Sequence, residues 1–217
     1  MLLHTVHIPF GAKNNKLKLI VFTIPRTGSH VIGRSANANG YKVIHEPFMP
    51  DEKYQNYDKF IKKVVSPSEN VVVFDHYFVY SNYDRNYVNK CIRDYDLKIV
   101  LLRRDKLQQA ISAVYARRFL VNEGEGWNSK KRVPARLPIK LIKTRFKNLV
   151  SSEKELCKLN LPIFYYEDIL ADPTNFPVKL TIEHYRPPEK SDYILNHKEI
   201  KLASASWIKE LSLDFSN

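Results

Sequence analysis

The sequence is poor in the features that mark several classes of protein. Only two of its 217 residues are cysteine, Cys91 and Cys157. They form no motif, so we expect two half-buried helix residues in a reducing compartment. No cysteine and histidine cluster has the spacing of metal ligands, and we expect no metal site. No apolar run approaches the roughly 20 residues that a membrane-spanning helix needs.

Composition and length indicate one globular domain. Hydrophobic residues make up 44% of the chain and charged residues 27%, a balance typical of a folded protein. A chain of this length can bury a sizeable core, and we expect residues 1–217 to form a single domain. Residues 1–10 lack the basic start and the small-residue cleavage site of a secretory signal, so the expected location is cytoplasmic.

Acidic residues are scarce in the middle of the chain. The formal net charge is +12, and residues 98–147 contribute +11 of it, with 14 lysines and arginines against three acidic residues. A positive field of this size favours an anionic ligand. Nucleic acid, an acidic glycan, an anionic membrane and a small nucleotide all fit the charge, which alone does not choose among them.

Patterns typical of buried strands alternate with helical patterns along the chain. Apolar runs predict strands at 17–22, 41–44, 71–74, 98–102 and 161–166. Apolar residues at helical spacing predict the main helices at 30–39, 51–65, 86–94, 107–115, 139–159 and 203–211. The alternation predicts an α/β fold, a P-loop-like three-layer domain whose central parallel sheet has helices on both faces. Residues 121–138 break the pattern with glycines and prolines, and we interpret them as a lid or an acceptor loop.

Residues 17–39 carry the clearest functional pattern. A predicted strand runs into the sequence IPRTGS at residues 24–29, and a helix follows. Such a strand, loop and helix direct unpaired backbone N–H groups and the helix dipole at a phosphate. The loop is not a Walker A loop, because Ser29 stands in place of the lysine and Thr23 in place of the first glycine. Its cation, Arg26, comes before the glycine.

Other polar residues also follow predicted strands. Glu46, His76 and Arg104 each come just after one, and ligands of parallel α/β sheets bind at this edge. Ser112 lies eight residues after Arg104, on the next predicted helix. An arginine fork and a hydroxyl group can hold a terminal phosphate from two directions. The sequence therefore predicts a second phosphate site at this edge.

Three segments together resemble the sulfotransferases that use 3′-phosphoadenosine 5′-phosphosulfate (PAPS). They are IPRTGS with its helix, IVLLRRDKLQQAISAVYAR at residues 99–117, and YEDILADP at residues 166–173. The similarity covers roughly residues 17–172 and is closest to the bacterial, trehalose-sulfating branch of the carbohydrate sulfotransferases. In that branch R-R-D-K-x-x-Q-A-x-S is a typical run.

The resemblance implies roles for particular residues. The 3′-phosphate would be bound by Arg104 and Ser112. The tail at 187–217 contains a run similar to a family segment that closes over the nucleotide, and it is expected to pack near it. The residues that would hold the 5′-phosphosulfate are Arg26, Thr27, Gly28, Ser29 and His30.

The resemblance also implies a reaction without a metal or a covalent enzyme intermediate. A hydroxyl or amine of the acceptor, expected to be a carbohydrate or glycolipid, attacks sulfur, and adenosine 3′,5′-bisphosphate leaves. Arg26 would neutralise the leaving phosphate. Glu46 and His76 are equal candidates for the base that removes the acceptor proton. The glutamate base of the trehalose-sulfating branch cannot be carried over, because Phe48 and Met49 stand in its place.

Two other functions are alternatives at this point. A P-loop kinase-like phosphotransferase would share the architecture, but it would need magnesium and the loop lysine that this chain lacks. A basic nucleic-acid-binding module would use residues 98–147. No motif for reading DNA or RNA is present, and we expect no specific nucleic-acid partner.

Overall fold

The computed structural model describes residues 16–46, 69–76, 98–120, 133–182 and 189–213. Within these ranges five parallel strands form one sheet, in the order β2-β3-β1-β4-β5. Central strands are buried on both faces, which explains their continuous apolar sequences. The strands are β1 Lys18–Phe22, β2 Lys42–His45, β3 Val71–Asp75, β4 Lys98–Arg103 and β5 Ile163–Tyr165.

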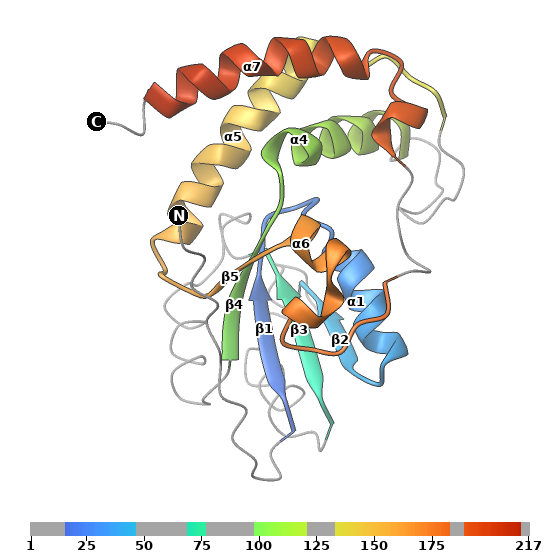
Figure 1. Ribbon diagram of the computed structural model, residues 1–217, viewed down its shortest axis with the longest axis vertical. Coiled ribbons are helices and arrows are strands. Elements are labelled where there is room, and N and C mark those ends of the chain that lie inside the picture. Colours follow the sequence, from blue (N-terminus) through green and yellow to red (C-terminus); the bar gives the residue numbers. More distant parts are fainter. Residues whose placement is uncertain (1–15, 47–68, 77–97, 121–132, 183–188, 214–217) are drawn as a thin grey trace, which may run out of the picture.

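Helices cover both faces of this sheet (Figure 1). One face is packed by α4, α5 and α7, and the other by α1 and α6. The α-helices are α1 Ser29–Ala38, α4 Lys106–Tyr115, α5 Ile139–Cys157, α6 Tyr166–Ala171 and α7 His197–Leu213. Short turns of other helix types are η1 Ala116–Leu120, η2 Pro173–Asn175 and η4 Lys190–Asp192.

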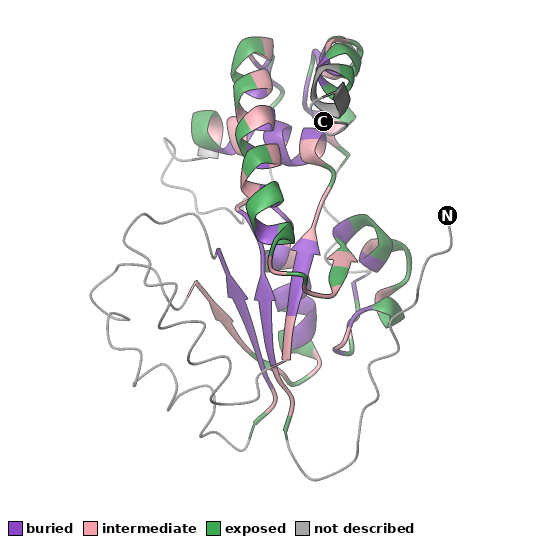
Figure 2. Cartoon of the chain, turned by 90° about the vertical axis from the view of Figure 1, so that its left-hand side faces the viewer, coloured by how far each residue is buried: buried purple, intermediate pink, exposed green. Residues whose placement is uncertain are grey.

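Alternate residues of the central strands point into two separate cores. In β1, Ile20 and Phe22 pack with α4 and α5, whereas Leu19 and Val21 pack with α1 and α6. Figure 2 shows the central strands as mostly buried and the outer faces of the helices as exposed. The three-layer, P-loop-like α/β fold predicted from the sequence is confirmed.

The strand order puts a ligand-binding position at the centre of the sheet. The connection after β1 runs through α1 toward β2, on one side, while the connection after β4 runs through α4 toward β5, on the other. Neighbouring strands whose connections diverge leave a crevice at their carboxyl ends. The loop after β1 and Arg104, which follows β4, both lie at this point.

Three expectations from the sequence are corrected by the structure. The strand predicted at 161–166 is limited to β5, and Tyr166 instead begins α6. The last helix, predicted at 203–211, is α7 and already begins at His197. Cys157 is exposed rather than half-buried, because it ends α5 on the outer side.

Some predictions concern residues outside the described ranges. These are the helices at 51–65 and 86–94, Cys91, and most of the loop at 121–138. The end of that loop is described, and there Ala135 forms a parallel bridge with Ile194. The assignment of residues 1–217 to one domain stays a prediction.

Candidate functional site

The loop after β1 has a backbone shape that suits an anion. Arg26 and Gly28 have positive φ angles, 72° and 103°, so the chain turns sharply twice before α1 begins at Ser29. Gly28 is the N-cap of α1 and supplies no side-chain cap. Among the described residues, the N–H groups of positions 27–30 make no hydrogen bond. Four donors at a helix N-terminus are therefore available to a negatively charged group.

Gly28 is required for a second reason besides its φ angle. A Cβ atom built at this position would lie 2.2 Å from the ring of Tyr166, the first residue of α6. The loop therefore packs directly on a buried aromatic ring. The sequence analysis recognised Tyr166 only as part of a family-like segment and assigned it no place at the loop.

The carbonyl oxygens of the loop are bound by the protein itself. Thr27 donates its hydroxyl hydrogen to the carbonyl of Ile24. Gln109 of α4 donates to the carbonyl of Pro25 at 2.7 Å, and Arg104 donates to that of Arg26 at 3.0 Å. Three successive carbonyls are thus turned toward protein donors. Since the Thr27 hydroxyl is used within the loop, this residue would bind a ligand through its backbone N–H.

The two predicted phosphate sites meet in the structure. The guanidinium group of Arg26 donates to the hydroxyl of Ser112 from Nε at 3.3 Å and from Nη2 at 3.2 Å. The sequence analysis placed Arg26 at one phosphate and Ser112, with Arg104, at the other. The contact joins the loop to the second half of α4, although 86 residues separate Arg26 from Ser112.

Arg104 has a different environment from Arg26. Its guanidinium group stacks on the Tyr166 ring at 4.6 Å, and its Nε lies 3.7 Å from a carboxylate oxygen of Glu167. Lys190 is a second cation near Arg104. Burial, and then the charge of Arg104, lower the pKa of Lys190 to about 7. Lys190 had no predicted role of its own, although it lies in the segment 187–217, which is expected to pack near the nucleotide.

Glu46 and His76, the rival candidates for the base, lie side by side. They follow the neighbouring strands β2 and β3, whose register puts His45 opposite Phe74. Nδ1 of His76 lies 2.9 Å from Oε1 of Glu46, at ion-pair distance but outside hydrogen-bond alignment. Both side chains are largely buried. The two residues therefore form a carboxylate–imidazole pair rather than two independent candidates.

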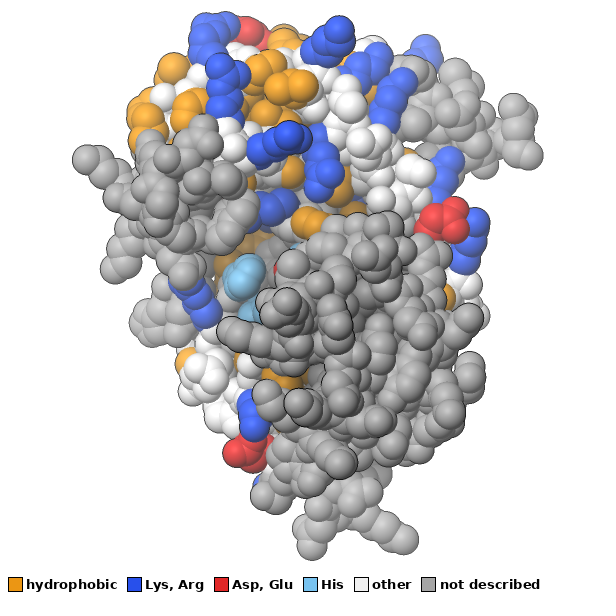
Figure 3. All heavy atoms as spheres, turned by 180° about the vertical axis from the view of Figure 1, so that it is seen from behind, with side chains coloured by type: hydrophobic (Ala, Val, Ile, Leu, Met, Phe, Trp, Pro, Cys, Tyr) orange, Lys and Arg blue, Asp and Glu red, His pale blue; other side chains and the backbone are white. Residues whose placement is uncertain are grey.

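Two histidines stack on each other, one next to the loop in sequence and one next to Glu46. The rings of His30, on α1, and His45, on β2, stack with their centroids 4.3 Å apart. Burial lowers the pKa of His30, and it lowers the pKa of His45 to about 4. Burial therefore favours the uncharged form of both rings, and a bound anion would oppose this shift at His30. Figure 3 shows histidine side chains on a face where lysine and arginine side chains also gather.

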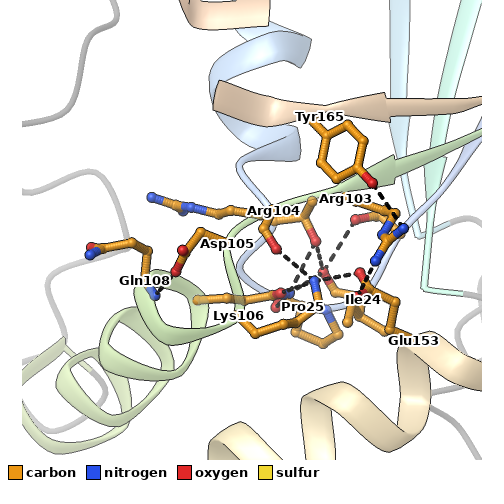
Figure 4. Close-up of polar contacts among 12 residues, drawn as sticks. Ile24, Pro25, Arg103, Arg104, Asp105, Lys106, Gln108, Glu153 and Tyr165 are labelled. Atoms are coloured by element: carbon orange, nitrogen blue, oxygen red, sulfur yellow. Dashed lines mark hydrogen bonds and ion pairs between the residues drawn. The ribbon is translucent and has the colours of Figure 1, made fainter. Parts of the chain in front are cut away.

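A buried polar network supports the loop from the side of α4 and α5. Lys106 lies 2.5 Å from Glu153, whose other carboxylate oxygen accepts a hydrogen bond from Arg103 at 2.8 Å. Figure 4 shows these three side chains directed toward one another, with Arg104 pointing away. An open pocket of about 480 Å³ adjoins the network and is lined partly by Arg104 and Glu167. The sequence analysis assigned no role to Lys106, Gln109 or Glu153.

The described residues include neither a cluster of metal ligands nor a membrane-spanning helix. They contain no group of three histidine, cysteine, aspartate or glutamate side chains arranged to hold a metal ion. Their helices include none that is long and apolar enough to cross a membrane.

No protein-family model matches this sequence, and no curated protein matches it. Among solved structures, the fold is similar to mouse sulfotransferase SULT7A1 complexed with PAP, with a TM-score of 0.40 and 13% identity over 75% of this chain. This chain spans 55% of that sulfotransferase chain. A second similar structure is the PezAT chromosomal toxin-antitoxin system of Streptococcus pneumoniae, with a TM-score of 0.39 and 10% identity over 91% of this chain and 88% of the other. Likenesses this distant carry no argument about activity.

Proposed function

We propose that this protein is a sulfotransferase that transfers a sulfuryl group from PAPS to a hydroxyl or amine of an acceptor. The observation that carries the proposal is the loop after β1. Its N–H groups at positions 27–30 are available, its carbonyls are bound elsewhere, and its cation is an arginine linked to Ser112. This is an anion site without the lysine of a Walker A loop.

The residues present fit a donor that carries negative charge at both ends. The loop N–H groups and Arg26 would hold the 5′-phosphosulfate and stabilise the charge that develops on the leaving phosphate. Arg104 and Ser112 would hold the 3′-phosphate, and the contact between Ser112 and Arg26 links the two positions. PAPS itself supplies the activated sulfuryl group.

His76 would remove the acceptor proton, and Glu46 would orient it. A carboxylate beside Nδ1 stabilises the tautomer that carries its hydrogen on that atom, which leaves Nε2 able to accept a proton. The 2.9 Å separation between Glu46 and Nδ1 supports this division of roles. Under this proposal the two candidates have different roles, His76 as the base and Glu46 as a positioning residue.

We further propose a carbohydrate or glycolipid acceptor, on the strength of the run from Arg103 to Ser112, which resembles the carbohydrate-sulfating branch. The positive charge of residues 98–147 would suit an acceptor that is itself acidic. We also propose that PAPS is the donor, that no metal takes part, and that the protein is located in the cytoplasm.

The test has a binding arm and a transfer arm. Adenosine 3′,5′-bisphosphate at millimolar concentration should raise the melting temperature, because a ligand that binds only the folded state stabilises it. Adenosine 5′-monophosphate, which lacks the 3′-phosphate, should raise it less. A panel of sugars and glycolipids with labelled PAPS then identifies the acceptor. No shift with the bisphosphate would contradict the proposal.

A magnesium chelator separates this proposal from a kinase-like reaction. Sulfuryl transfer should continue when magnesium is removed, whereas phosphoryl transfer by a P-loop kinase should stop. Phosphate transfer from ATP that stops on chelation would favour the kinase. Nucleic-acid binding with a steep salt dependence, and no affinity for the bisphosphate, would favour the basic binding module.

A further inference from the structure

Gln109 of α4 is completely buried, and its amide group faces the loop after β1. Its Nε2 lies 2.7 Å from the carbonyl oxygen of Pro25, 3.3 Å from that of Ile24 and 3.1 Å from the hydroxyl oxygen of Thr27. A glutamine has two amide hydrogens, so three acceptors share them. One side chain thus contacts three residues of the loop, from more than 80 residues away in the sequence.

The other end of the same amide is held by Lys106. Its ammonium group donates to Oε1 of Gln109 at 3.1 Å and to the carbonyl of Arg104 at 2.7 Å, and it lies 2.5 Å from Glu153. An ammonium group has three hydrogens, and three acceptors surround this one. Glu153 is anchored in turn by Arg103.

This arrangement fixes which way the amide of Gln109 points. Lysine is only a donor, so the oxygen of Gln109 must face Lys106 and its NH₂ group must face the loop. A buried amide locked in this way keeps the carbonyls of Ile24 and Pro25 turned inward. These two carbonyls belong to the peptide units that lead from Ile24 to Arg26, and Gln109 also contacts the hydroxyl of Thr27. Gln109 therefore fixes the backbone that enters the loop before a ligand arrives, while Arg104 holds the peptide plane that carries the N–H of Thr27.

We propose that Gln109, oriented by Lys106 and Glu153, is a positioning residue that orders the phosphate-binding loop. The expected effect of Gln109 on nucleotide binding rests on the proposed function, whereas its expected effect on the order of the loop does not.

The experiment compares Gln109→Glu and Gln109→Met with Gln108→Glu. Gln108 precedes Gln109 on the same helix, is only partly buried, and makes no side-chain hydrogen bond among the described residues. Glutamate at 109 would set a carboxylate against three oxygen atoms, while methionine keeps the volume and removes the donors. The control Gln108→Glu makes the same change of charge at the neighbouring position.

Two measurements are made on each full-length variant. Titration calorimetry with adenosine 3′,5′-bisphosphate gives a dissociation constant and a stoichiometry. A smaller folded fraction lowers the stoichiometry but leaves the dissociation constant of the folded protein unchanged, so a merely structural role does not move the constant. Hydrogen exchange without ligand reports the loop amides at 26–30 separately from those of β1 and β3.

We expect both changes at Gln109 to weaken binding about tenfold or more, in line with the loss of buried hydrogen bonds. The loop amides should exchange faster while the sheet amides keep their rates, and Gln108→Glu should match the wild type.

Wild-type binding and wild-type loop exchange in Gln109→Met would overturn the inference. If the wild type does not bind the bisphosphate, the proposed function fails, and hydrogen exchange in Gln109→Met alone decides whether Gln109 orders the loop. If Gln109→Glu does not fold, Gln109→Met decides.

Discussion

The carboxyl edge of the sheet has two chemically different halves, one on each side of β1. Toward β4 lie Arg26, Arg104 and Lys190, which bring positive charge to the loop. Toward β3 and β2 lie a carboxylate and histidines, of which His30 and His45 have lowered pKa values. The first half can hold anions and the second can accept a proton. Because these groups stand on different strands, each half can be altered while the other keeps its geometry.

The largest effect is expected in the proton-accepting half. His76→Asn should reduce turnover by about 10²–10⁴-fold while leaving the affinity for adenosine 3′,5′-bisphosphate nearly unchanged. Glu46→Gln should cost less, about 10–100-fold, because a positioning partner is lost and the base remains. Steady-state rates and titration calorimetry check both. Full activity in both variants would remove the pair from the mechanism, and weaker nucleotide binding would erase the distinction between the halves.

In the anion-binding half the effects should appear first in nucleotide affinity. Arg104→Ala should weaken binding of the bisphosphate by about 10–100-fold, and Ser112→Ala by about fivefold, since hydrogen bonds to charged donors are the stronger. Arg26→Ala should reduce both affinity and turnover. Arg34→Ala, an exposed arginine on α1, is the matched control and should change neither. Equal losses for Arg34 and Arg104 would mean that only the general positive field matters.

Gly28 lies in the loop after β1, and its replacement tests the support of that loop. Gly28→Ala should reduce the free energy of unfolding by about 2–3 kcal/mol, because φ is 103° and the Tyr166 ring fills the space of a Cβ atom. Gly40→Ala also meets a positive φ, 83°, but no atom lies within 4 Å of its Cβ position. It should cost only about 1 kcal/mol. Urea unfolding measures both, and equal losses would show that the packing on Tyr166 contributes nothing.

The smallest expected effect is a pH dependence confined to the anion-binding half. The pKa of Lys190 is lowered to about 7, so this lysine loses its charge as the pH rises through 7. An anion favours the charged form, and binding above pH 7 must therefore take up a proton. Affinity for the bisphosphate should fall by about threefold to tenfold between pH 7 and 9, since one ion pair is affected. Lys190→Met should bind more weakly at pH 7 and lose this dependence. A dependence that persists in Lys190→Met would assign it to another group.

Local patterns were enough to predict the layers of the fold. Val71, Val72 and Val73 predict a strand buried on both faces, and β3 is one. The first helix, predicted from residue 30, begins one residue earlier, at Ser29. The errors arose where tertiary contacts outweigh local preference. Tyr166 continues an apolar run, yet its ring packs against Gly28, and the chain turns into α6 at that residue.

The candidate site also has one part that the sequence predicts and another part that it does not. Its residue types and their places after strands could be predicted, because parallel strands bring their carboxyl ends to one edge. Gln109 belongs to the family-like run, but it could not be identified as a support of the loop, because the run alone does not show which element its side chain faces. Only the packing of α4 beside the loop sets its amide against Pro25 and Thr27.

By itself the sequence determined that a parallel sheet forms, that a lysine-free loop follows its first strand, and that polar residues gather at one edge. Apolar periodicity and chain punctuation are local properties, and a single stretch of sequence expresses them fully. The tertiary structure alone decided that Arg26 contacts Ser112 and that Glu46 pairs with His76. Hydrogen bonds and ion pairs act over about 3 Å, and only the folded chain brings residues from distant segments to that distance.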